Sequence, residues 1–157
     1  MPKRADAAGS APPESRVSLD IGSVRLFERH VHGDPPAAQE LAAIEADIER
    51  ALATAGPLAR VQAHEPLTLV GVAGTVTTLK ALELGLAPYD PTRIHGAALT
   101  LSAVESLCAK LASLSLAERM RLPGLEPKRA DVIVAGALIV RDLLPRAGEV
   151  GVHVAEF

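Results

Sequence analysis

Hydrophobic residues in the first half of the chain follow two different spacings. Apolar and polar side chains alternate over residues 16–21, which is typical of a half-buried β-strand. Apolar residues recur at steps of three and four over residues 37–55, which predicts an amphipathic helix with Asp34 as its N-cap. A shorter helix is predicted over residues 24–31.

The second half alternates short apolar runs with longer helical patterns. Residues 132–140 are nearly all apolar, so their periodicity fits either a buried strand or a buried helix. Because the segment extends over residues 129–144, too long for a typical strand, we favour a helix in which Gly136 lets a neighbouring element approach closely. The other predicted strands are 67–73, 94–99 and 150–154, and the other predicted helices are 75–85, one capped by Thr100 or Ser102 that ends at 114, and a short one with a Ser115–Glu118 capping box.

This order of strands and helices indicates an α/β protein with several flanking helices, and 157 residues suffice for one domain. Residues 1–15 lack apolar periodicity and are rich in Ala, Pro, Gly and Ser. We therefore predict a disordered segment at 1–15 and a folded domain over 16–157. The sequence PKRAD occurs at both 2–6 and 127–131, but five residues are too few to indicate a structural repeat.

Composition and charge narrow the classes of function. Aromatic residues make up only 2% of the chain, so its core must consist of Ala, Leu, Val and Ile. The net charge of −3 argues against a general surface for polyanions such as nucleic acids, although a local cationic pocket remains compatible with it. We see no apolar run long enough for a membrane span and no apolar segment after the basic N-terminus that would make a signal peptide.

Cys108 is the single cysteine, so no intramolecular disulfide can form and we expect a reducing compartment, the cytoplasm. Because Cys108 lies among apolar residues of a predicted helix, we interpret it as a buried thiol rather than a nucleophile. The five histidines show no spacing typical of metal ligands.

The segment LVGVAGTVTTL at residues 69–79 is the strongest candidate for a binding site. It reads as an apolar strand, a glycine turn and a helix, and Gly71 and Gly74 remove side chains where backbone must approach another group. The first amides of such a helix are donors at the positive end of its dipole, which favours phosphate binding, and the threonines add hydroxyl groups. The simpler alternative is an ordinary strand-to-helix turn in which the threonines only cap the helix.

Together with this segment, two further stretches carry a resemblance to a known family. They are SLDIGSVRL at 18–26 and GLEPKRADVI at 124–133, followed by Gly136. In order and spacing the three stretches resemble the C-terminal part of the exopolyphosphatase/guanosine-pentaphosphate phosphatase (Ppx/GppA) family, from about residue 16 to residue 154. The resemblance implies a partial ribonuclease-H-like lobe of the actin/sugar-kinase/Hsp70 superfamily, with a cleft beside it.

The same resemblance implies hydrolysis of terminal phosphoanhydride bonds in polyphosphate or guanosine pentaphosphate, usually with Mg²⁺. It implies that Gly71, Gly74 and Thr75 lie in the superfamily's nucleotide-contacting turn, and we add Thr77 as a substrate-binding hydroxyl. Arg25 is a candidate phosphate clamp, because guanidinium binds phosphate through two hydrogen bonds. The alternative for Arg25 is a surface or lobe-interface arginine.

Lys128 and Arg129 precede the predicted helix 129–144 and are poorly placed for its dipole. They face either the cleft or a partner, or they form a solvated pair, which is the simpler interpretation. Asp20 resembles a phosphate-loop aspartate only superficially, because the glycines of that loop do not follow it.

Several parts that the family uses for hydrolysis have no counterpart in this sequence. We find neither phosphate loop, of the Asp-x-Gly-Ser-Asn-Ser and Asp-x-Gly-Gly-Gly-Ser types, nor the catalytic glutamate, and we identify no Mg²⁺ ligand. The family also continues into a further helix after its last strand. We therefore expect the chain alone to be inactive or nearly so. The alternative is a non-catalytic nucleotide-binding or self-association module, whose partner is a second copy or an N-terminal lobe.

Overall fold

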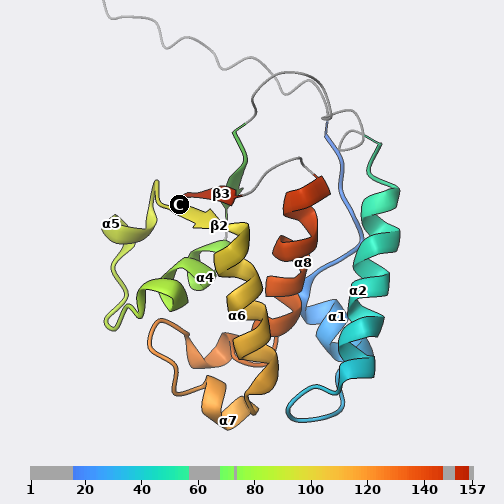
Figure 1. Ribbon diagram of the computed structural model, residues 1–157, viewed down its shortest axis with the longest axis horizontal. Coiled ribbons are helices and arrows are strands. Elements are labelled where there is room, and N and C mark those ends of the chain that lie inside the picture. Colours follow the sequence, from blue (N-terminus) through green and yellow to red (C-terminus); the bar gives the residue numbers. More distant parts are fainter. Residues whose placement is uncertain (1–15, 57–67, 73, 147–150, 156–157) are drawn as a thin grey trace, which may run out of the picture.

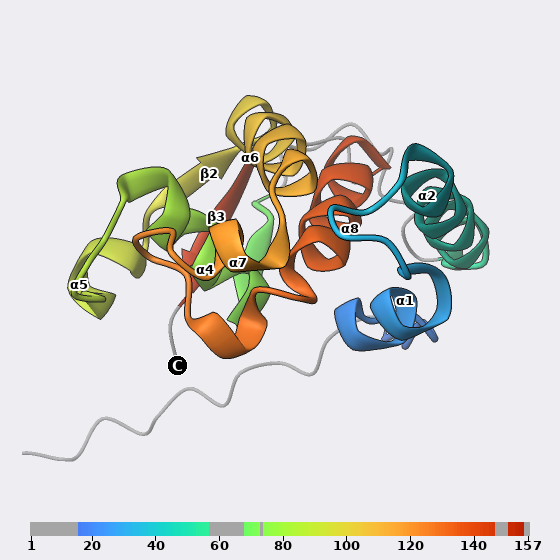
Figure 2. The ribbon, with the colours of Figure 1, turned by 90° about the horizontal axis from the view of Figure 1, so that it is seen from below.

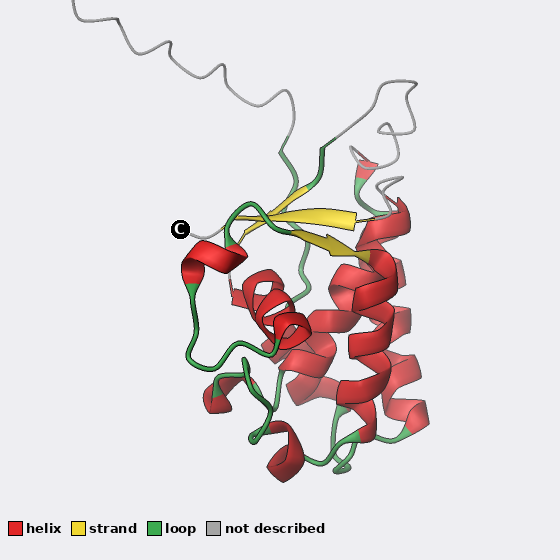
Figure 3. Cartoon of the chain, turned by 60° about the vertical axis from the view of Figure 1, so that its left-hand side comes forward, coloured by secondary structure: helices red, strands yellow, loops and turns green. Residues whose placement is uncertain are grey.

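The computed structural model describes residues 16–56, 68–72, 74–146 and 151–155. These parts form an α/β structure in which the helices lie to one side of a small sheet, as Figure 3 shows. The fold class predicted from the sequence is thereby confirmed. The predicted disordered segment 1–15 lies outside the described residues.

The central strand of the sheet is β3 (Gly151–Ala155). Strand β3 runs parallel to β1 (Val70–Val72) on one side and antiparallel to β2 (Ala98–Thr100) on the other. The strand order within the described residues is therefore β1-β3-β2. Val152 and Val154 are buried against the helices, while His153 between them is exposed. This alternation is typical of a strand with one covered face.

The described helices are α1 (Ser23–His30), α2 (Ala38–Ala53), α4 (Gly74–Leu84), α5 (Pro91–Ile94), α6 (Leu101–Ser113), α7 (Leu116–Arg119), the 3-10 turn η1 (Pro127–Arg129) and α8 (Ile133–Arg146). Figure 1 shows α6 and α8 in the middle of the molecule, α1 and α2 beyond α8, and α4 and α5 on the opposite side. Figure 2 gives the same arrangement from below.

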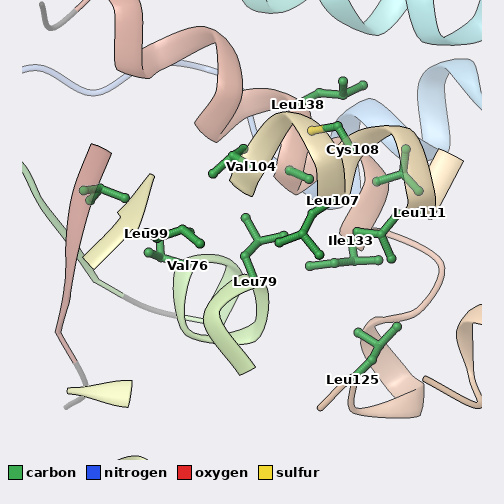
Figure 4. Packing of buried hydrophobic residues seen from close by; sticks show 14 of the residues in the cluster. Val76, Leu79, Leu99, Val104, Leu107, Cys108, Leu111, Leu125, Ile133 and Leu138 are labelled. Atoms are coloured by element: carbon green, nitrogen blue, oxygen red, sulfur yellow. The ribbon is translucent and has the colours of Figure 1, made fainter. Parts of the chain in front are cut away.

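The core is aliphatic, as the composition predicts. Figure 4 shows Leu79 of α4, Leu107 of α6 and Ile133 of α8 pointing toward one another, and Leu138 of α8 beside Cys108 of α6. Burying a side chain of this size contributes about 1.5–3 kcal/mol. Within the described ranges, no helix is long and apolar enough to cross a membrane.

Helix α4 contacts two neighbouring elements at glycine residues. A Cβ on Gly136 of α8 would lie 2.9 Å from the Thr75 side chain, and a Cβ on Gly71 of β1 would lie 2.9 Å from that of Val76. The interpretation of the apolar run as a helix is confirmed for residues 133–140, although α8 begins at Ile133 and not at residue 129, and Gly136 has the role expected from the sequence. It brings the backbone of α8 against α4.

Two predictions for the first half are wrong. Residues 16–21 form no strand, because the alternating segment pairs with none of the strands that the structure describes. Asp34 does not cap α2, which begins at Ala38. Instead the Glu40 carboxylate accepts a hydrogen bond from the backbone N–H of Ala37 at 2.9 Å, and Asp34 accepts one from the N–H of Leu116 at the start of α7.

Two strand predictions need correction. The predicted buried strand 67–73 reduces to Val70–Val72 among the described residues. Both valines are more than half exposed, and the residue of this strand that packs against α4 is Gly71. The predicted strand 94–99 gives way to β2 at Ala98–Thr100. Its first residue, Ile94, belongs to α5, whose N-cap is Asp90.

The remaining helix predictions are confirmed with small shifts at their ends. Thr100 rather than Ser102 caps α6, and Ser115 and Glu118 form the predicted capping box of α7. Helix α8 runs one residue past Pro145, whereas the sequence placed the helix end before it.

We expect Gly124→Ala to destabilise the chain by about 3 kcal/mol or more, because strain and overpacking add at this position. Gly124 has a φ of +92°, and a Cβ there would lie 2.5 Å from the carbonyl oxygen of Ala81 in α4. Gly85 is the matched control. Its φ is +60° but no atom lies within 4 Å of an added Cβ, so Gly85→Ala should cost about 1 kcal/mol. Urea unfolding measures both variants, and equal losses would contradict the contact with α4.

Candidate functional site

A cleft of about 880 Å³ opens beside the N-terminal end of α4. Gly74, Thr77 and Thr78 of α4 line one side of the cleft. Glu126 and Arg129 line another side of the cleft. Glu126 directly precedes η1, and Arg129 is the last residue of η1. The cleft thus joins the glycine turn at 69–79 to the segment 124–133, which lies about fifty residues further along the chain.

The N-terminal end of α4 lies at this cleft. β1 ends at Val72 and α4 begins at Gly74, while the side chains of Val76 and Leu79 anchor the helix in the core. The first N–H groups of an α-helix have no acceptor within the helix, and they lie at the positive end of its dipole. The Thr77 hydroxyl donates a hydrogen bond to the carbonyl of Gly74 at 3.2 Å.

The guanidinium group of Arg129 lies directly against Gly74. A Cβ on Gly74 would be 2.1 Å from Nη1 of Arg129, so the arginine occupies the space that any larger residue would need. A permanent positive charge therefore lies at the N-terminal end of α4, and the Arg129 side chain keeps 41% of its surface exposed. Two sources of positive potential meet at one point of the cleft.

Glu126 partly offsets this charge. Its carboxylate lies 3.4 Å from Nε of Arg129 and 2.9 Å from Nζ of Lys128. The hydrogen bond and charge of Lys128, followed by those of Arg129, lower the pKa of Glu126, so this carboxylate is ionised at neutral pH. An anion that enters the cleft would compete with Glu126 for Arg129.

One wall of the cleft is apolar. It consists of Leu86, Ala87, Pro88 and Tyr89, which follow α4 in the chain. Tyr89 is 46% exposed, so its ring is accessible. A cleft with a cationic end and an apolar wall can accept a molecule that carries both an anionic group and a flat ring.

The structure brings some of the predicted site residues together but not all of them. Gly74 and Thr77 line the cleft. Gly71 packs against Val76 beneath it, and Thr75 faces α8 at Gly136. Arg25 lies on α1, exposed and paired with Asp20, away from the cleft lining. The participation of these residues in substrate binding stays a prediction.

Sequence reasoning did not identify the wall around Arg129. It left Arg129 open between the cleft and a solvated pair with Lys128, and it did not consider Glu126, Thr78 or Tyr89 as site residues. The structure separates the basic pair, since Arg129 lines the cleft and Lys128 does not. The position of Arg129 three residues before the nearly continuous apolar run 132–140 was the available signal.

The described residues do not form a metal site of their own. Within the described ranges, no group of three or more His, Cys, Asp or Glu could hold a metal ion, and Glu126 is the one carboxylate that lines the cleft. Cys108 is buried in α6 among core residues, away from the cleft, as predicted. Burial raises its thiol pKa to about 11.

Comparisons of the sequence and of the structure with known proteins point to one protein family. Residues 7–150 match the Ppx/GppA phosphatase family. The chain is 38% identical over 135 residues to Exopolyphosphatase 2 of Mycobacterium tuberculosis, which covers 83% of this chain and 42% of that protein. It is 30% identical over 127 residues to Exopolyphosphatase 1 of Mycobacterium leprae, which covers 81% of this chain and 37% of that protein.

A solved structure gives the same result for the fold. The Ppx/GppA phosphatase of Aquifex aeolicus superposes with a TM-score of 0.78 at 32% identity, over 90% of this chain and 45% of that one. The chain thus spans less than half the length of these relatives. The predicted α/β lobe is confirmed as the fold of this family.

We expect the Cys108 thiol to be unreactive in the folded chain. With a pKa of about 11, only about one thiol in a thousand is ionised at pH 8, and the thiolate is the reactive form. Ellman's reagent at pH 8 should therefore modify native Cys108 at least about a hundredfold more slowly than urea-unfolded chain. Comparable rates in the two states would show that Cys108 is accessible.

We expect Gly74→Ala to displace Arg129 without unfolding the chain. The added Cβ meets only the flexible end of an arginine side chain, and alanine favours a helix, so the free energy of unfolding should change by less than about 1 kcal/mol. The ¹⁵N NMR signal of the Arg129 Nε–H group should shift. Gly22→Ala is the control, because no atom lies within 4 Å of its added Cβ. An unshifted Arg129 signal in Gly74→Ala would contradict the contact.

Proposed function

The chain belongs to the Ppx/GppA phosphatase family, and we propose that it forms the C-terminal lobe of a phosphoanhydride hydrolase. In this proposal the cleft beside α4 binds the phosphate chain of inorganic polyphosphate or of a guanosine polyphosphate. Both the names of the relatives and the chemistry of the cleft support this substrate class. The cytoplasm remains the expected compartment.

The observation that carries the proposal is the position of the Arg129 guanidinium against Gly74. Backbone donors at a helix N-terminus bind phosphate oxygens well, and an arginine can donate two further hydrogen bonds to the same group. Thr77 and Thr78 add hydroxyl groups along the same wall. Such a site is specific for a multiply charged anion because it combines fixed donors with a permanent charge.

The apolar wall supports guanosine polyphosphate as one of the substrates. Pro88 and Tyr89 offer a surface against which a purine ring can stack, while its phosphates lie toward Arg129. Inorganic polyphosphate has no group that would use this wall. The difference in affinity between guanosine polyphosphate and inorganic polyphosphate therefore measures the contribution of the apolar wall. The affinity that both ligands lose when Arg129 is replaced measures the contribution of Arg129.

In the proposed reaction, a water molecule attacks the terminal phosphoryl group in line with the leaving oxygen. Backbone amides at α4 and Arg129 would stabilise the negative charge on the phosphate oxygens. The general base, the two phosphate loops and the Mg²⁺ ligands have no identified counterpart in this chain. We therefore propose that the chain alone binds substrate with little or no turnover.

The second candidate function is a binding or self-association module. The observation that favours it is the exposure of two apolar side chains on β1, Val70 and Val72, of which Val72 also lines the cleft. Apolar surface of this kind is typical of faces that associate with another lobe or a second copy. Static light scattering over a range of concentrations would distinguish a monomer from a self-associating chain.

We expect Arg129→Ala to weaken binding of tripolyphosphate and of guanosine pentaphosphate by about tenfold or more, because charge-assisted hydrogen bonds are lost. Isothermal titration calorimetry measures this loss. Lys128→Ala is the matched control, because it removes one positive charge at the adjacent position. The Lys128 side chain is 74% exposed and does not line the cleft. Lys128→Ala should weaken binding by less than about threefold.

Two results would overturn the proposal. Equal losses for Arg129→Ala and Lys128→Ala would indicate a diffuse electrostatic effect in place of a site, and absence of binding to the unmodified chain would exclude the cleft as a phosphate site. Phosphate release from polyphosphate is measured in parallel with Mg²⁺ present. Rapid release that a substitution in this chain abolishes would contradict the expected lack of turnover.

A further inference from the structure

Arg119 is a charged side chain inside the core, outside the cleft. It lies on α7, and only 2% of its surface is exposed. Its guanidinium Nε donates a hydrogen bond to the carbonyl of Ala130 at 2.8 Å. Its Nη1 donates to the carbonyls of Leu111 at 3.2 Å and Leu114 at 2.7 Å.

Burial of the Arg119 charge is unfavourable, and the carbonyl and carboxylate groups around it offset this unfavourable free energy. A buried guanidinium destabilises a fold unless its donors find acceptors. Burial lowers the pKa of Arg119, and the negative charges of Asp34 and Asp131 oppose this effect. An arginine nevertheless stays protonated in proteins, so Arg119 is a permanent charge held by carbonyl oxygens and two nearby carboxylates.

The acceptors of Arg119 belong to two separate parts of the chain. Leu111 and Leu114 lie at the C-terminal end of α6, where the last carbonyl groups lack the N–H donors of a following helical turn. The backbone hydrogen bond that the Leu111 carbonyl accepts from the N–H of Leu114 is long, at 3.4 Å. Ala130 directly follows Arg129 and is fully buried. Arg119 therefore connects the end of α6 to the residue after Arg129.

The segment that carries Arg129 has little stability of its own. η1 is a single turn, Pro127–Arg129, and short 3-10 turns have poor hydrogen-bond geometry. Its backbone bonds run from the N–H of Arg129 to Glu126 and from that of Ala130 to Pro127. An anchor outside η1 is needed to hold its last residue at a fixed distance from α4.

We propose that Arg119 is a positioning residue, which places the Arg129 guanidinium against Gly74 by holding the carbonyl of Ala130. The functional consequence rests on the proposed phosphate binding in the cleft. The planar fork of arginine is required because its donors reach the end of α6 and Ala130 at the same time. Lysine keeps the charge but has a single point of attachment, so it separates the effect of charge from that of geometry.

The first experiment needs no ligand. Backbone amide exchange of Arg129 and Ala130 is measured by NMR in the full chain, in Arg119→Lys and in Arg121→Lys. We expect at least about tenfold faster exchange in Arg119→Lys, since release of the Ala130 carbonyl loosens η1. Arg121 is exposed, so Arg121→Lys should leave both rates unchanged. Unchanged rates in a folded Arg119→Lys variant would overturn the proposal.

The second experiment tests whether Arg119 acts through Arg129. Tripolyphosphate affinity is measured by calorimetry for Arg119→Lys, Arg129→Ala and the double variant. We expect Arg119→Lys to weaken binding about tenfold in the original chain and less than about twofold when Arg129 is already alanine. Full additivity of the two losses would show a general structural effect and would refute the positioning role.

The two experiments distinguish failure of the inference from failure of the proposed function. If the unmodified chain does not bind tripolyphosphate, the phosphate site is wrong, and amide exchange alone decides whether Arg119 positions η1. If Arg119→Lys does not fold, Arg119→Gln takes its place. If neither variant folds, exchange of the Arg119 Nε–H in the unmodified chain decides. Exchange as fast as that of Arg121 overturns the inference, and strong protection supports it.

Discussion

Helix α4 packs so closely against its neighbours that they have glycine at the points of contact. Gly71 of β1, Gly136 of α8 and Gly124 after α7 each lie where a Cβ would come within 3 Å of an α4 atom. Protein interiors are as dense as organic crystals, so contacts of this kind allow little freedom of movement. The position of α4 is therefore set by backbone contacts with a strand, a helix and a loop.

This packing determines the geometry of the cleft. Because α4 cannot shift without disturbing Gly136 or Gly124, its N-terminal end and the Gly74 amide have a fixed position. Arg129 reaches the same point from the other side of the cleft, through η1. A helix end and a guanidinium group that converge on one point form a more specific anion site than either alone, since donors are prearranged before a ligand arrives. Glu126 keeps this positive potential local, in accord with a net charge of −3 for the whole chain.

Much of the fold follows from the hydrophobic pattern. The helical spacing of Ile44, Ile48 and Leu52 predicts α2, and the Ser115–Glu118 pair predicts α7, because both signals depend on neighbours within a few residues. The wrong predictions involve partners far along the chain. Residues 16–21 have the pattern of a strand but no strand to pair with among the described residues. Asp34 has the chemistry of a helix cap, but its carboxylate accepts the N–H of Leu116 in α7, a helix whose N-cap is Ser115, and it does not cap the start of α2.

The amino-acid sequence by itself determined the α/β class, the family, and the glycine turn at 69–79, because each depends on local patterns or on shared motifs. Only the tertiary structure decided what that turn faces. Local signals cannot reveal that Arg129 lies against Gly74, since 55 residues separate them and several packed helices bring them together. The same holds for Arg119, whose hydrogen bonds to α6 and Ala130 depend on the arrangement of α6, α7 and η1 around the core.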